Sequence, residues 1–204
     1  MTANTTSKSS SKQSLRQSLR LARKQLSHPE QLAASIGLCR QLLMHPRFIY
    51  CKRLAVYIAN DGEIDLQPLI HLAWSLHKQV YLPVLHPFRQ GELIFMQYTP
   101  GQPLANNRFG IPEPLSPTDT RIPTWMLDLV LTPLVGFDVD GNRMGMGGGF
   151  YDRTFAFVQQ NIRPRAPYLV GVAHECQKTE GLITESWDIA MNGIVTGSNA
   201  YRCE

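Results

Sequence analysis

The chain has few of the features that would place it in a membrane or an oxidising compartment. Its 204 residues contain no apolar run of about 18 residues, the length that a transmembrane helix needs. No apolar segment follows the basic N-terminal residues, so no secretory signal is expected. The cysteines form no CxxC pair, which argues against a zinc site and a disulfide framework: Cys39, Cys51, Cys176 and Cys203. We therefore expect a reduced, cytoplasmic protein.

Acidic residues are missing from the first 29 positions. Six basic residues lie there: Lys8, Lys12, Arg16, Arg20, Arg23 and Lys24. They carry +6, against +4 for the whole chain, so the remaining residues carry −2. The basicity is therefore local, and a local basic segment suits an anionic ligand such as a nucleotide, a polyglutamate or a nucleic acid.

The N-terminal segment divides into two parts. Residues 1–11 are rich in Ser, Thr, Lys and Asn and have no apolar anchor, which predicts a disordered tail. From Ser14 to Leu26 apolar residues recur at helical spacing, at positions 15, 19, 22 and 26. Cations occupy the neighbouring stripe, at positions 12, 16, 20 and 23. The pattern predicts a helix that packs along one edge and presents cations on the other.

Short apolar runs alternate with helical segments along the rest of the chain. The runs at 54–58, 79–84, 128–134, 168–173 and 193–196 are typical of buried strands, and 92–98 alternates as a half-exposed strand does. Helices are expected at 28–44, 66–77 and 150–161, the first opening with a capping box, Ser27 to Glu30. This order indicates an α/β fold with a mostly parallel sheet, in a single domain over 12–204. Residues 100–124 form a long Pro- and Gly-rich loop, which is typical of a functional segment.

The strand at 128–134 leads into a glycine cluster, Asn142-Arg143-Met144-Gly145-Met146-Gly147-Gly148-Gly149-Phe150-Tyr151-Asp152-Arg153. Glycines let backbone N–H groups approach a phosphate, and a helix starting at Phe150 would add its positive end. Arg143 can neutralise phosphate and Asp152 can hold a metal. No Gly-Lys-Ser/Thr follows, so this is not a Walker A motif, and its spacing does not fit a dinucleotide fingerprint. The cluster predicts the phosphate-binding loop of an ATP-using enzyme.

Several ordered motifs over residues 12–200 together resemble one enzyme family. They are Lys12-x-x-Leu15-Arg16, Tyr57 followed by Glu63-Ile64-Asp65, Gly110-Ile111-Pro112-Glu113-Pro114, Phe137-Asp138-x-x-Gly141 continuing through the glycine cluster, and Gln177 followed by Asp188. This set is similar to 5-formyltetrahydrofolate cyclo-ligase, also called methenyltetrahydrofolate synthetase. The resemblance implies a three-layer α/β/α fold. It also implies cyclisation of 5-formyltetrahydrofolate to 5,10-methenyltetrahydrofolate with ATP and Mg²⁺, giving ADP and phosphate.

The resemblance also implies roles for particular residues. Arg143 and Asp152 would be catalytic, and Asp152 and Asp188 would bind the metal. ATP would lie against Lys12, Arg16, Arg143, Met144, Gly145, Met146, Gly147, Gly148, Gly149, Phe150 and Tyr151. The folate would lie against Ile58, Glu63, Phe109, Gly147, Gly148, Gly149 and Phe150. The sequence departs from the common family pattern at Met144, at Met146 and at Phe150, which replaces a tyrosine.

Simpler interpretations compete with these roles. Lys12 and Arg16 could form a solvated helix face, Glu63 and Asp152 could be first-turn helix acids, and Phe109 could anchor a loop in the core. His174 and the three tryptophans are most simply structural. An alternative function is a non-catalytic nucleotide- or nucleic-acid-binding regulator that uses the basic helix. A third is an ATP-independent sugar-phosphate isomerase or CoA-transferase-like enzyme.

For the leading interpretation the expected partner is the small-molecule folate, with or without a polyglutamate tail. No membrane or nucleic-acid partner is expected, and the chain should be a monomer or a weak dimer.

Overall fold

An eight-stranded sheet forms the centre of the computed structural model, which describes residues 3–115, 120–160 and 165–203. Across the sheet the strands are β12 (Ala200–Arg202), β11 (Gly193–Val195), β10 (Tyr168–Val172), β7 (Leu129–Pro133), β1 (Arg53–Ala55), β2 (Gln79–Leu85), β3 (Leu93–Tyr98) and β6 (Arg121–Ile122). The five strands from β11 to β2 run parallel, and β12, β3 and β6 pair antiparallel at the edges. The prediction of a mostly parallel sheet is confirmed.

The central strands are apolar on both faces because both faces are covered. In β7, Leu129 and Leu131 pack into one core and Val130 packs into the other. In β10, Val170 belongs to the first core and Leu169 to the second. Successive side chains of a strand point to opposite faces, so a continuous apolar run serves two cores at once.

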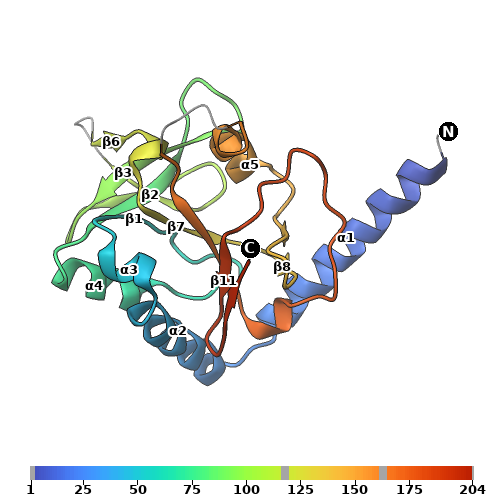
Figure 1. The fold of residues 1–204 in the computed structure, drawn as a ribbon, viewed down its shortest axis with the longest axis horizontal. Helices are drawn as coiled ribbons and strands as arrows, with labels where there is room; N and C mark the ends of the chain where they lie inside the picture. The colour runs from blue at the N-terminus through green and yellow to red at the C-terminus, as the bar shows by residue number, and fades with distance from the viewer. Residues whose placement is uncertain (1–2, 116–119, 161–164, 204) are drawn as a thin grey trace.

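Helices lie on both sides of the sheet, as the three-layer prediction requires (Figure 1). On one face lie α2 (His28–Leu43), α3 (Pro46–Tyr50) and α4 (Gln67–Ser75), which contribute Leu38, Phe48 and Ile70 to the first core. On the other face α5 (Phe150–Phe155) and the 3₁₀ turn η2 (Ala156–Val158) contribute Phe155 and its neighbours to the second core. The predicted capping box is present, since the Ser27 N–H and hydroxyl both donate to the Glu30 carboxylate.

Helix α1 (Ala3–Lys24) projects from the body with its N-terminus far from the sheet (Figure 1). Its C-terminal half packs against η3 (Glu175–Gln177), and Leu19 approaches Gly136 so closely that a Cβ there would lie 2.6 Å from a Leu19 methyl. The prediction of a disordered tail over 1–11 does not hold for residues 3–11, which are helical. Residues 3–24 contain no Gly or Pro that would interrupt a helix. Residues 3–11 extend a helix that already exists, so they avoid the free-energy cost of starting a new one.

Several local features differ from the sequence prediction. The segment 100–124 contains a hairpin of β4 (Leu104–Asn106) and β5 (Pro112–Pro114), then β6 and the turn η1 (Thr124–Met126). A second hairpin, β8 (Gly136–Phe137) with β9 (Arg143–Met144), precedes the glycine cluster. The helix predicted over 150–161 is six residues long in α5 and ends in η2; residue 161 lies outside the described residues. No helix in the described part is long and apolar enough to cross a membrane.

Candidate active site

A cavity of about 1250 Å³ opens beside the carboxyl ends of β1, β2 and β7. Parallel strands end at the same edge of a sheet, and this edge is the usual ligand-binding position in open α/β folds. Typical small-molecule sites occupy about 300–1000 Å³. The cavity is therefore large enough for two ligands at once.

Every residue that the sequence predicted for the site lines this cavity. They are Lys12, Arg16, Ile58, Glu63, Phe109, Arg143, Met144, Gly145, Met146, Gly147, Gly148, Gly149, Phe150, Tyr151, Asp152 and Asp188. They come from α1, the segment after β1, the loop before β5, the glycine cluster with α5, and the loop before β11. The fold thus brings these distant segments together, while their individual ligands remain predictions.

The cations of α1 contact protein groups rather than solvent alone. Arg16 donates from Nε to the Gly145 carbonyl at 2.8 Å, and Lys12 Nζ pairs with Glu185 Oε1 at 2.9 Å. The interpretation as a solvated face is wrong for Arg16, whose contact is partly buried, whereas the Lys12 ion pair lies at the surface. These two contacts join α1 to the glycine cluster and to the loop before β11.

Three further cations of α1 converge on Asp61. Arg20 binds its carboxylate at 2.7 Å, Lys24 also pairs with it, and Arg23 binds it at 2.9 Å. Arg23 is completely buried and also donates to the Asp61 and Leu134 carbonyls. Hydrogen bonds from Arg20, Lys24 and Arg23 hold the pKa of Asp61 well below its usual range. The sequence gave no sign of this cluster.

Glu63 lies in the segment between β1 and α4, next to that cluster. It precedes the N-cap residue Leu66, so the interpretation as a first-turn helix acid is wrong. Its side chain is 14% exposed, accepts a hydrogen bond from the Asn60 N–H at 3.0 Å and lies 3.9 Å from Arg23. Burial raises the pKa of Glu63 to about 7, although Asn60 and Arg23 oppose the shift. Its carboxyl group therefore changes protonation state near neutral pH.

The glycine cluster presents backbone N–H groups to the cavity. Gly147 and Gly149 have left-handed φ angles of 94° and 63°, which favour glycine. Arg16 and Arg153 bind the carbonyls of Gly145, Gly148 and Gly149. Within the described residues, the N–H groups of Gly147, Gly148 and Gly149 donate to no protein acceptor. The loop therefore has its carbonyls occupied and its donors available, as an anion site requires.

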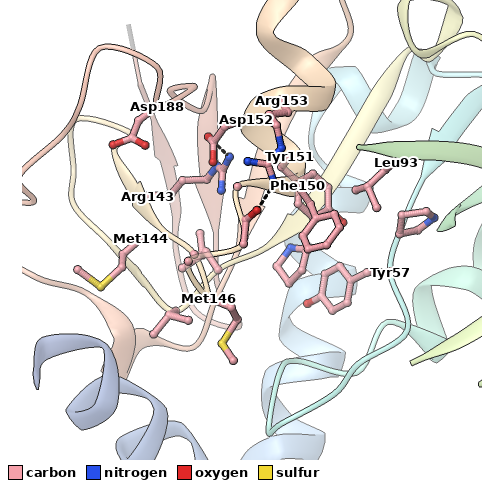
Figure 2. Close-up of a pocket in the computed structure, with 18 of the residues that line it drawn as sticks. Tyr57, Leu93, Arg143, Met144, Met146, Phe150, Tyr151, Asp152, Arg153 and Asp188 are labelled. Carbon is pink, nitrogen blue, oxygen red and sulfur yellow. Dashed lines mark hydrogen bonds and ion pairs between the residues drawn. The ribbon is translucent and has the colours of Figure 1, made fainter. Parts of the chain in front are cut away.

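Arg143 and Asp152 form an ion pair at the end of this loop (Figure 2). Arg143 Nη2 lies 2.5 Å from Asp152 Oδ1, which also accepts from the Ile189 N–H at 3.1 Å. Arg143 Nε is buried and has no hydrogen-bond partner among the described residues. The Arg143 side chain is only 5% exposed, so Asp152 is the main partner of its charge. Asp152 lies in the first turn of α5, as the interpretation as a helix acid requires. Because α5 has only six residues, its dipole stabilises this negative charge less than the longer predicted helix would.

A sequence model of the 5-formyltetrahydrofolate cyclo-ligase family matches residues 8–197. This chain belongs to that family. It is 41% identical over 183 residues to the 5-formyltetrahydrofolate cyclo-ligase of Escherichia coli (strain K12), covering 90% of this chain and 98% of the relative. It is 47% identical over 146 residues to that of Haemophilus influenzae, covering 72% and 76%.

The fold agrees with that assignment. The NMR structure of Aquifex aeolicus 5,10-methenyltetrahydrofolate synthetase superimposes with a TM-score of 0.77 at 31% identity, covering 94% of this chain and 92% of that one. The family membership expected from the motifs is thus confirmed, and the chain is an enzyme of the cyclo-ligase type.

The aromatic residues of this cyclo-ligase face the cavity. Phe109 is 52% exposed, and its ring meets the Phe150 ring edge-on at 5.9 Å, so it is not a core anchor. Trp187 is 66% exposed and lines the cavity, whereas the sequence suggested simple packing. Burial raises the pKa of both Tyr57 and Tyr151 well above the usual range. These phenols stay neutral at physiological pH.

Several lining residues were missed from the sequence for physical reasons. Arg23 looked like one cation in a stripe, because its burial depends on Asp61, 38 positions away. Glu113 accepts from the Leu85 N–H and the Asn107 amide, contacts that exist only once the hairpin β4–β5 has formed. His174 does not line the cavity; it is buried just after β10, where burial lowers its pKa to about 4 and its Nε2 has no hydrogen-bond partner among the described residues, so its structural role stays a prediction.

Proposed function

We propose that this chain catalyses the ATP-dependent cyclisation of 5-formyltetrahydrofolate to 5,10-methenyltetrahydrofolate, with release of ADP and phosphate. The observation that carries the proposal is the convergence of two different subsites on one cavity. One side has cations and free backbone donors, and the other has a buried carboxyl group with apolar and aromatic neighbours. The names and sequences of the relatives support the same reaction.

The nucleotide would occupy the side formed by α1 and the glycine cluster. Lys12 and Arg16 lie one helical turn apart and line the same cavity as the loop. Arg143 lines the same cavity at the other end of the loop. Phosphoryl transfer needs mainly positioning and charge neutralisation, and these groups can supply both.

The folate would occupy the side formed by the segment after β1. The Glu63 carboxylate can accept hydrogen bonds from the amino edge of a pterin, and Ile58 adds apolar surface beside it. Phe109 and Phe150 offer exposed ring faces and edges for stacking. In Figure 2 Arg143, Asp152 and Asp188 lie on one side of the view and Tyr57 on the other, which suits two neighbouring ligands.

The side chains present also fit a magnesium ion. Asp152 and Asp188 line the cavity, and Mg²⁺ usually takes one or two carboxylates with phosphate oxygens and water completing its shell. The described residues contain no group of three or more His, Cys, Asp or Glu side chains placed to hold a metal, so the phosphates would have to contribute ligands. When bound, the ion would neutralise phosphate charge. Asp152 would then serve both the ion and Arg143, since a carboxylate has two oxygens for such contacts.

The resemblance to the family suggests the order of the steps. The formyl oxygen attacks the γ-phosphorus of ATP and ADP leaves, which makes the formyl carbon electrophilic. N10 then attacks that carbon and loses its proton, and the C–O bond breaks to release phosphate. Arg143 and the free N–H groups of the loop would hold the transferred phosphoryl group in both steps.

The test is to incubate the purified protein with 5-formyltetrahydrofolate and Mg-ATP and to follow methenyltetrahydrofolate by its near-UV absorbance. Product should form in equal amounts with ADP and only when ATP is present. Product formed equally without ATP would instead support the ATP-independent class of enzyme. Absence of product together with salt-dependent RNA or DNA binding would support the regulator. The pairing of four α1 cations with Asp61 and Glu185 speaks against that last reading.

A further inference from the structure

The side chain of Arg153 joins the glycine cluster to a distant turn of the chain. From α5 its Nη2 donates to the Gly148 carbonyl, and its Nε donates to the Gly91 carbonyl at 2.9 Å. Gly91 lies in the turn 86–92 between β2 and β3, which the His86 N–H closes by donating to the Glu92 carbonyl. The same turn is tied to α5 a second time, since the Leu93 N–H donates to Thr154 Oγ1 at 2.9 Å.

Two glycines make room for the Arg153 guanidinium. A Cβ at Gly91 would overlap its Nη2 atom, and a Cβ at Gly149 would lie 2.8 Å from its Nη1 atom. Both glycines also have left-handed φ angles, 81° and 63°. By contrast, Gly101 has a similar φ of 75° but has no atom within 4 Å of its would-be Cβ. Gly91 therefore differs from Gly101 in this contact and not in its backbone conformation.

The contacts of Arg153 determine which way the peptide groups of the glycine cluster point. Arg153 binds the Gly148 carbonyl through its side chain and the Gly149 carbonyl through its own N–H at 3.0 Å. In a trans peptide the C=O and the following N–H point in opposite directions, so fixing the Gly148 carbonyl also fixes the Gly149 N–H. That N–H is one of the donors left available to an anion. Arg153 does not need to touch the nucleotide to determine how the loop receives it.

We propose that Arg153, seated between Gly91 and Gly149, is a positioning residue that orients the glycine cluster for the phosphates of ATP, and that Gly91 supports ATP binding by making room for Arg153. The inference rests on the proposed function, because it assigns the phosphates of that reaction to this loop. It extends the site to a turn outside the family motifs quoted for the glycine cluster.

The test compares Gly91→Ala with Gly101→Ala in the full-length enzyme. The two substitutions place the same methyl group on the same left-handed backbone, and only the first displaces the Arg153 guanidinium. Gly91→Ala should raise KM for ATP about tenfold, the loss expected when a charge-assisted hydrogen bond no longer holds a binding loop. KM for 5-formyltetrahydrofolate should stay within about twofold, and Gly101→Ala should leave both values unchanged. Equal effects of the two alanines, or an equal rise of both KM values in Gly91→Ala, would overturn the proposal.

A double-mutant cycle decides whether Gly91 acts through Arg153. Arg153→Ala should also raise KM for ATP, and adding Gly91→Ala to it should cause no further loss. Additive effects would show that Gly91 acts independently and would contradict the inference. ATP binding measured by calorimetry without folate gives the same comparison in the absence of turnover. Failure of cyclisation in the wild type would refute the proposed function, while calorimetry would still test the role of Arg153.

Discussion

At the scale of single residues, the proposed folate subsite contains one carboxyl group, Glu63, whose charge is finely balanced. Burial makes the Glu63 carboxylate costly, while the nearby Arg23 and the Asn60 N–H favour it. The result is a pKa of about 7, so both protonation states are present at neutral pH. Only the ionised form accepts hydrogen bonds with both oxygens.

Substrate binding should therefore depend on pH through Glu63. Below pH 7 the ionised fraction falls about tenfold per pH unit, so KM for 5-formyltetrahydrofolate should rise by the same factor. Above pH 7 it should level off. The measurement is KM against pH from 5.5 to 8.5, with Glu63→Gln as the control. A wild-type profile as flat as that of Glu63→Gln would remove Glu63 from substrate recognition.

The stability of the folded protein should increase as pH falls, whereas substrate binding should weaken. The pKa of Glu63 is higher in the folded protein than the ordinary value of 4.5, so the folded state binds more protons between these values. Its contribution to stability is therefore full below about pH 4.5 and is lost as pH rises through 7. Glu63→Gln should be more stable than wild type at pH 8 by roughly 1–3 kcal/mol, with the gain shrinking towards pH 5. Urea unfolding at the two pH values measures this difference; equal gains at both would contradict it.

The ion pair between Arg143 and Asp152 yields a third prediction at this scale. Asp152→Ala leaves the buried Arg143 without its carboxylate, and Arg143→Ala removes the charge itself. Each variant should stay folded and lose about 100-fold or more in kcat, the size typical for one group that stabilises transition-state charge. Circular dichroism checks the fold and the cyclisation assay gives kcat. Normal turnover in either variant would move the phosphoryl site elsewhere.

At the scale of elements, local patterns predicted most helices and strands, and distant contacts explain the misses. The capping box fixed the start of α2, and continuous apolar runs identified β7 and β10 because both faces of those strands are buried. The hairpins β4–β5 and β8–β9 are too short to carry a pattern. The burial of Arg23 depends on Asp61, which no helical periodicity can reveal.

Helix α1 should consequently be held to the body by charge. Arg23→Met leaves Asp61 with partly exposed cations only and removes three hydrogen bonds, one buried and two partly buried. It should destabilise the protein by about 3–5 kcal/mol, the usual loss when one partner of a buried ion pair is removed. Lys24→Met, at the same carboxylate but half exposed, should cost less than about 1 kcal/mol. Thermal unfolding compares the two variants; equal losses would contradict the assignment of Arg23 as the anchor.

At the scale of the whole molecule, the site arises because the parallel sheet gathers loops from distant parts of the chain at one edge. The sequence predicted the residues of that site through ordered motifs, and the structure brings all of them to one cavity of about 1250 Å³. Motifs did not reveal the supports behind them, such as Arg23 at Asp61 or Arg153 at Gly91, since each support pairs residues far apart in sequence. The sequence therefore predicted the residues that line the cavity more readily than the residues that hold them in place.

The central claim is that phosphate is passed to the formyl oxygen within this cavity. The most direct test uses 5-formyltetrahydrofolate carrying ¹⁸O in its formyl group, with unlabelled ATP and unlabelled water. Mass spectrometry of the released phosphate should find the label in it, in proportion to the methenyltetrahydrofolate formed. Unlabelled phosphate, with the ¹⁸O released in water, would contradict the account.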